Sequence, residues 1–166
     1  MAAKRNVTLT LVLITFVAAI ALFPAGGALA GTAAVSAPAD AKCPVCGMFV
    51  GKYPDWYTAL TFRDGTKVYF DGPKDMFTFC LDMKKYSPAK SPKEIASIAV
   101  KDYYSLKVID ARKAFFVSGS NVYGPMGKEL VPFARETDAR EFLKDHRGKK
   151  ILRFGDVTPA VLKSLE

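Results

Sequence analysis

The pattern of hydrophobic and polar positions changes its period several times along the chain, and each change predicts a new element. Alternating apolar, aromatic and Thr positions over 56–62 and 67–70 predict two strands, joined by a hairpin turn at Asp64-Gly65. A period near 3.6 then begins after Asp71-Gly72-Pro73 and predicts a helix over 73–86. The first part of the chain therefore runs strand, strand, helix.

The second part of the chain repeats this order. A strand over 114–117 that ends at Ser118-Gly119, a returning strand over 129–133 and a helix capped by Thr137 are expected. Pro132 places the returning strand at a sheet edge. Further strands are expected over 98–109 and 151–154, and a short helix after Thr158-Pro159. We predict an α+β fold with two related strand-strand-helix halves packed together, over about 43–97 and 98–166.

The first thirty residues are typical of a secretory signal peptide. Lys4 and Arg5 precede an apolar run over 7–23, and Ala28-Leu29-Ala30 follows as a small-residue cleavage site. An uncleaved membrane anchor is the alternative, because the run is at the short edge of what spans a bilayer. We expect a periplasmic protein with a signal peptide over 1–30, a flexible leader over 31–42 and one domain over 43–166.

The charge of the chain limits its classes of partner. The net charge is +8, and 22 basic and 16 acidic residues remain after the first thirty. This excess favours acidic partners and association with anionic membrane surfaces. The basic residues are dispersed and line no predicted helix, so we exclude nucleic acid as a partner.

Three cysteines, Cys43, Cys46 and Cys80, allow one disulfide at most. In an oxidising compartment, Cys43 and Cys46 could pair, and a thiol-disulfide redox protein is then one functional hypothesis. Structural zinc is a weaker interpretation, because a tetrahedral site takes four ligands and the sequence has no second cysteine pair. Cys80 falls on the apolar face of its predicted helix, where a cysteine packs as a small hydrophobe.

The strongest chemical signal is the segment Cys43-Pro44-Val45-Cys46-Gly47-Met48. Thiolate and thioether sulfur atoms select Cu(I) over harder cations. If the segment is extended, Cys46 and Met48 point to the same side and can hold one ion. Met126 lies in a Gly-Pro-Met-Gly turn at the surface, where a thioether gains little from burial.

We therefore predict a Cu(I) site formed by Cys46, Met48 and Met126, with Cys43 as a further candidate ligand. A site of three soft ligands that is open on one side can also pass its ion on. The alternative is that both methionines fill gaps in the hydrophobic core.

These motifs resemble those of the NosL family, the bacterial periplasmic copper-binding accessory proteins of nitrous oxide reductase. The likeness spans about Lys42 to Val157 and includes the Cys-Gly-Met unit, the Gly-Pro-Met-Gly turn and the segment 140–149. It implies two related α+β halves, as in part of organomercurial lyase. It also implies Cu(I) bound by Cys46, Met48 and Met126, in a metallochaperone and not an enzyme.

The resemblance further implies partners, namely copper, a membrane maturation complex and a client enzyme, which is nitrous oxide reductase or another exported copper enzyme. Family members are commonly lipoproteins, whereas no cysteine lies near the predicted cleavage site. Cys43 adds a thiol that serves either as a second ligand or as a disulfide partner of Cys46. Organomercury cleavage is a third hypothesis, and Asp55 is a remote candidate for the carboxylate that it needs beside paired thiols.

Overall fold

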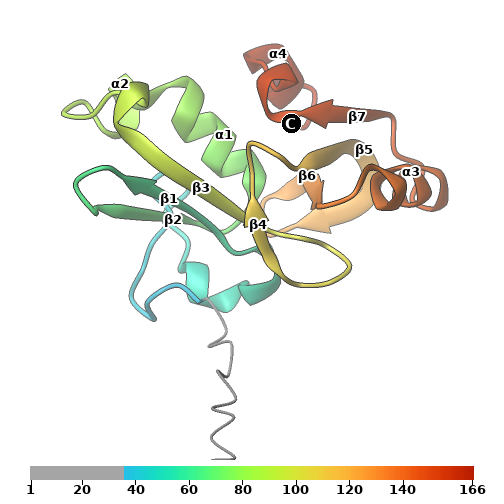
Figure 1. Cartoon of the computed structure of the whole chain (residues 1–166), viewed down its shortest axis with the longest axis horizontal. Coiled ribbons are helices and arrows are strands. Elements are labelled where there is room, and N and C mark those ends of the chain that lie inside the picture. Colours follow the sequence, from blue (N-terminus) through green and yellow to red (C-terminus); the bar gives the residue numbers. More distant parts are fainter. Residues whose placement is uncertain (1–35) are drawn as a thin grey trace, which may run out of the picture. The chain divides into compact units, whose positions relative to one another are not determined.

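The computed structural model of the chain describes residues 36–166. The predicted signal peptide and the start of the leader lie outside the described residues. No helix within 36–166 has the length and apolar character needed to span a bilayer. The strands and helices of this part (Figure 1) are β1 (Thr58–Phe62), β2 (Lys67–Phe70), α1 (Pro73–Leu81), α2 (Met83–Tyr86), β3 (Ile95–Lys101), β4 (Val108–Asp110), β5 (Phe115–Gly124), β6 (Gly127–Phe133), α3 (Glu136–Asp145), β7 (Lys150–Arg153) and α4 (Pro159–Lys163), with 3-10 turns at Val50–Lys52, Pro54–Trp56, Pro92–Glu94 and Phe154–Asp156.

Two antiparallel sheets organise the chain. The first has the strand order β2-β1-β3-β4 and the second has the order β6-β5-β7. In each sheet a hairpin is followed directly by a helix, so that β1-β2-α1 and β5-β6-α3 have the same order of elements. The predicted α+β class is confirmed. The boundary predicted between residues 97 and 98 falls inside β3, which pairs with β1 on one side and β4 on the other.

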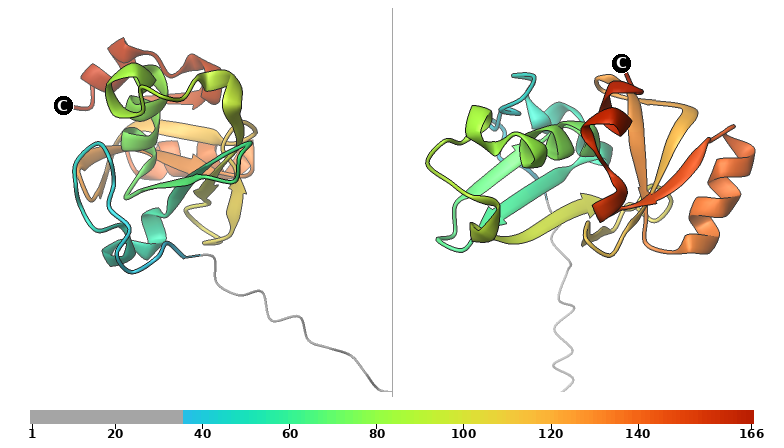
Figure 2. Two further views of the ribbon diagram at one scale, coloured as in Figure 1. Left: turned by 90° about the vertical axis from the view of Figure 1, so that its left-hand side faces the viewer. Right: turned by 90° about the horizontal axis from the view of Figure 1, so that it is seen from above.

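One hydrophobic core joins the two sheets. Phe77 of α1 packs against Phe116 of β5 with ring centroids 5.1 Å apart, and both side chains are buried. The next residue of β5, Val117, points the other way and joins a smaller cluster with Phe142 of α3. This alternation is the period of a strand. Figure 2 shows α1 packed on the first sheet, near α4, and α3 packed on the second sheet.

Several turns and edges form as the sequence predicts. Gly65 in the first hairpin has φ +85°, a left-handed conformation that glycine adopts without strain. The side-chain oxygen of Thr158 accepts a hydrogen bond from the backbone N–H of Val161 and so caps α4. Pro132 lies in β6, which is an edge strand, so its missing N–H interrupts no sheet ladder.

Several boundaries differ from the prediction. The region expected as strand over 98–109 divides into β3 and β4, which are separated by a turn after Lys101. The strand expected over 114–117 does not end at Ser118-Gly119 but continues as β5 to Gly124, with an irregular register after Ser118. Gly119, at φ +77°, allows this by absorbing the irregularity. Helix α3 is preceded by Arg135 and not by Thr137, and the helix predicted over 73–86 breaks at Asp82 into α1 and α2.

Candidate metal centre

The segment 43–48 forms a closed turn that presents two thiols on one side. The N–H of Cys43 donates to the carbonyl of Met48 (2.9 Å), and the N–H of Gly47 donates to the carbonyl of Cys43 (2.8 Å). Gly47 has φ +79°, and this left-handed residue reverses the chain between Cys46 and Met48. The prediction that residues 46–48 are extended is therefore wrong, because the local hydrogen bonds close a turn.

Two carboxylates reach this turn from the start of α1. Strand β2 ends at Phe70, and the next residue, Asp71, is 1% exposed. Gly72 and Pro73 then open α1, which places Asp75 in its first turn, 5% exposed. A negative charge in the first turn of a helix is favoured by the helix dipole. The fold thus brings two buried acids to one helix end.

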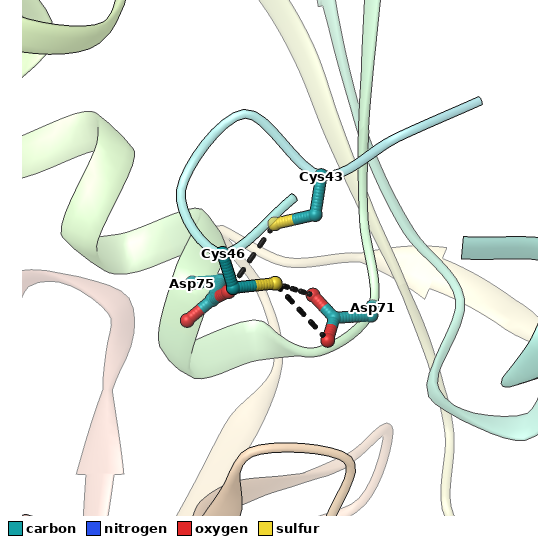
Figure 3. Close-up of side chains that lie close together, drawn as sticks. All are labelled: Cys43, Cys46, Asp71 and Asp75. Atoms are coloured by element: carbon teal, nitrogen blue, oxygen red, sulfur yellow. Dashed lines mark hydrogen bonds between the residues drawn. The ribbon is translucent and has the colours of Figure 1, made fainter. Parts of the chain in front are cut away.

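The thiols and the carboxylates contact one another (Figure 3). The Cys43 thiol donates to Oδ2 of Asp75 at 3.2 Å, and the Cys46 thiol donates to Oδ1 of Asp71 at 3.3 Å. One ligand atom from each of the four residues lies within 4.8 Å of the others. All three cysteines of the chain are free thiols. A single cation could therefore contact donors from both the loop and the helix start.

Burial keeps both thiols protonated at neutral pH. It raises the pKa of the Cys46 thiol to about 12, and the negative charge of Asp75 adds to this rise. Burial likewise raises the pKa of the Cys43 thiol far above its usual range. The pKa of Asp75 is also raised, first by burial and then by the nearby Asp71 carboxylate. A cation that binds here replaces the thiol protons and relieves the repulsion between the acids.

The turn that carries Met126 is fastened to the same helix end. Met126 lies between β5 and β6 and is 43% exposed. Its carbonyl accepts a hydrogen bond from Nζ of Lys74, the residue before Asp75. On β6, the Glu129 carboxylate accepts a hydrogen bond from the backbone N–H of Lys74. The cysteine loop and the methionine turn, far apart in the sequence, therefore both contact the segment 71–75.

The structure gathers some of the predicted residues and adds others. Cys43 and Cys46 lie together, while the roles of Met48 and Met126 as ligands stay predictions. Asp71 and Asp75 were not predicted as site residues. Acids are common at the start of a helix, so neither position indicated a further role. The signal that could have found them is the spacing of two acids around Gly-Pro, which places both at one helix end. Asp55, the remote candidate for a carboxylate beside the thiols, instead lines a hollow with Trp56 and Tyr123. The carboxylates beside the thiols are those of Asp71 and Asp75.

Comparisons with known proteins agree on one family. The NosL family model matches residues 34–162. The copper-binding lipoprotein NosL of Stutzerimonas stutzeri is 26% identical over 123 residues, which cover 74% of this chain and 64% of that protein. This chain thus aligns with less than two thirds of that relative's length.

A solved structure gives the same result. The crystal structure of the copper chaperone NosL from Shewanella denitrificans matches with a TM-score of 0.62 and 26% identity, over 76% of this chain and 96% of that one. The solution structure of apo-NosL from Achromobacter cycloclastes is 25% identical, with a TM-score of 0.46, over 63% of this chain and 87% of that one. The Stutzerimonas relative is named for copper binding and the Shewanella relative as a copper chaperone.

Proposed function

This chain belongs to the NosL family, and from that premise we propose that it is an exported Cu(I)-binding metallochaperone. Its ion is bound by the Cys46 thiolate together with the thioethers of Met48 and Met126, with Cys43 as a further ligand. Its client is nitrous oxide reductase or another exported copper enzyme, reached through a membrane maturation complex. The copper-binding name of the Stutzerimonas relative and the chaperone name of the Shewanella relative support this assignment.

The observation that carries the proposal is that the cysteine loop and the Met126 turn both contact the start of α1. The cysteine loop contacts this helix end through Asp71 and Asp75, and the Met126 turn contacts it through Lys74. Soft sulfur donors select Cu(I), and Met126, a residue that is 43% exposed, leaves one side of the proposed site open. An open side suits an ion that is handed from one protein to the next.

Binding of Cu(I) should release protons, because the raised pKa values keep the thiols protonated in the metal-free protein. Cu(I) binds the thiolate, so each cysteine that becomes a ligand releases one proton into solvent. The apparent affinity for Cu(I) therefore rises about tenfold per pH unit for each thiol that binds, in the range where the thiol is protonated. A site built from thioethers alone would show no such dependence.

The raised pKa values also weigh against the redox alternative. Thiol-disulfide oxidoreductases depend on an exposed cysteine whose pKa is lowered. Here Cys43 is 1% exposed, and burial raises the pKa of both thiols, with the charge of Asp75 adding to the rise. Such thiols react slowly with disulfides, whereas capture of a metal ion can supply the free energy that removes their protons.

A competition titration tests the proposal. The reduced protein is titrated with Cu(I) against a chromophoric chelator, beside Cys46→Ser, Met126→Leu and the control Cys80→Ser. Cys80 packs against Met76 within α1, with Sγ 3.7 Å from Sδ, so its loss should not change affinity. Cys46→Ser should bind Cu(I) most weakly and Met126→Leu should be intermediate. Unchanged affinity in both would reject the site.

A further inference from the structure

We propose that Glu129 is a positioning residue for the Cu(I) site, because its carboxylate fixes the Met126 turn to the start of α1. This inference rests on the function proposed above and goes beyond it, since Glu129 is not itself a ligand. It acts on the metal through the position of Met126.

The contacts of Glu129 join two elements that are 55 residues apart in the chain. Its Oε1 accepts hydrogen bonds from the backbone N–H of Lys74 at 2.6 Å and from the N–H of Leu130 at 2.8 Å. The side chain is 3% exposed. A buried carboxyl group whose Oε1 accepts from two backbone donors has one favoured position, so it fixes β6 relative to α1.

Helix α1 needs this acceptor because its own N-cap residue supplies no side-chain acceptor. The first backbone N–H groups of a helix have no partner within it. The N-cap residue of α1 is Gly72, which has no side chain and makes no capping hydrogen bond. Glu129 therefore caps α1 from a strand of the other sheet. The same carboxylate that completes the helix also fixes the hairpin that carries Met126.

Two glycines leave the space that the carboxylate occupies. A Cβ added at Gly72 would lie 2.3 Å from Oε2 of Glu129, and one added at Gly124 would lie 3.1 Å from the same atom. Gly72 has φ −176°, which any residue adopts, so close approach and not backbone conformation requires a glycine there. Gly124 ends β5 two residues before Met126. The two glycines that lie against the Glu129 carboxyl group, Gly72 and Gly124, therefore provide the space that it needs.

The test compares Cu(I) affinity in Glu129→Ala, Glu129→Gln and the matched control Glu141→Ala, whose side chain is exposed on α3. Loss of a residue that orients a metal ligand weakens binding by about 10- to 100-fold, and we expect this for Glu129→Ala. Glutamine retains the Oε1 acceptor, so Glu129→Gln should stay near the wild-type affinity. Gly72→Ala should resemble Glu129→Ala, because its methyl group displaces the carboxylate without removing it.

A double-mutant cycle with Met126→Leu identifies the route of the effect. If Glu129 acts by placing Met126, then adding Glu129→Ala to Met126→Leu causes no further loss of affinity. Losses that simply add would overturn the proposal, and so would a Glu129→Gln variant as weak as Glu129→Ala.

A measurement without copper separates this proposal from the proposed function. In the metal-free protein, hydrogen exchange at the Lys74 amide and the width of the Met126 methyl resonance report directly on the contact. We expect faster exchange and a narrower, more mobile methyl signal in Glu129→Ala and Gly72→Ala, with Glu141→Ala unchanged. Unaltered exchange and linewidth would overturn the positioning role, even if Cu(I) bound as proposed. The expected changes without any Cu(I) binding would reject the proposed function alone.

Discussion

The starts of α1 and α3 are built alike but differ in the partner of their acid. In each, a strand ends in Phe and the helix presents a Phe against it: Phe70 and Phe79 have ring centroids 5.3 Å apart, and Phe133 and Phe142 have them 4.9 Å apart. An acid stands four residues before each helical Phe, namely Asp75 and Asp138.

The partners of the two acids are a thiol and a guanidinium. Asp138 accepts two hydrogen bonds from Arg135, at 2.8 and 2.7 Å, in a two-pronged ion pair. Asp75 instead accepts from the neutral thiol of Cys43, and burial and the Asp71 carboxylate raise the pKa of its carboxyl group, although the charge of Lys74 lowers it. One helix start is neutralised by its own chain, whereas the other holds negative charge beside sulfur. The difference indicates that the start of α3, the second helix start, is a structural motif, whereas the start of α1, the first helix start, is suited to the cation of the proposed site.

The largest effects should come from what the two helix starts have in common. Phe79 and Phe142 are 1% and 0% exposed. Truncating a buried Phe removes apolar burial and leaves a cavity, so Phe79→Ala and Phe142→Ala should each lower the free energy of unfolding by about 3–5 kcal/mol. Urea denaturation followed by circular dichroism measures this. A small loss in one variant alone would show that the two packing units are not equivalent.

The next largest effect should be a pH dependence specific to the first helix start. Burial raises the pKa of Glu129 from 4.5 to about 8, despite hydrogen bonds from two backbone N–H groups. Between these two values the folded protein holds one proton more than the unfolded chain, so stability falls as pH rises. The fall should be on the order of a few kcal/mol and should be absent in Glu129→Gln. Denaturation across this pH range tests it, and parallel curves for the two proteins would contradict it.

A smaller effect should follow from removing the acid of the first helix start. Asp75 raises the pKa of the Cys46 thiol, so Asp75→Asn should lower it and speed alkylation of Cys46 about tenfold at a fixed pH. The rate is measured in a Cys80→Ser background. The matched change Asp138→Asn should leave the rate unaltered. Equal rates in all three proteins would show that the acid does not act on the thiol.

The smallest effect should come from the ion pair of the second helix start. The Arg135 side chain is largely exposed, and surface ion pairs contribute little to stability. Asp138→Asn should therefore lower the melting temperature only slightly and leave Cu(I) affinity unchanged. A loss of affinity in this variant would contradict the division between a structural and a metal-binding helix start.

The sequence predicted most of the scaffold because periodicity and turn residues are local signals. The hairpin at Asp64-Gly65, the edge position of Pro132 and the cap at Thr158 all follow from conformational preferences of single residues. The continuation of β5 past Ser118 was missed, since Ser-Gly-Ser-Asn is ordinary turn composition. Gly119 there forms an irregularity within a strand, which only pairing with β6 and β7 reveals.

The candidate site was predicted only on its sulfur side. Cys43 and Cys46 are close in sequence, so the sequence alone predicts that their thiols lie together. Their carboxylate partners lie 32 and 25 residues away, and only the folding of the loop onto α1 brings them together. The cap that Glu129 provides to α1 is equally hidden, because a lone Glu in a strand has no local mark of burial.

The most direct test of the central claim asks whether one Cu(I) ion contacts sulfur from both loops. X-ray absorption at the copper edge can be recorded on selenomethionine protein loaded with one Cu(I) per chain, as Met48→Leu and as Met126→Leu. Each variant retains one of the two candidate methionines, so a copper–selenium distance identifies its source. We predict a copper–selenium contact in both variants, alongside copper–sulfur from cysteine. Absence of selenium around copper in the Met48→Leu protein would mean that Met126 does not reach the ion and would contradict the two-loop site.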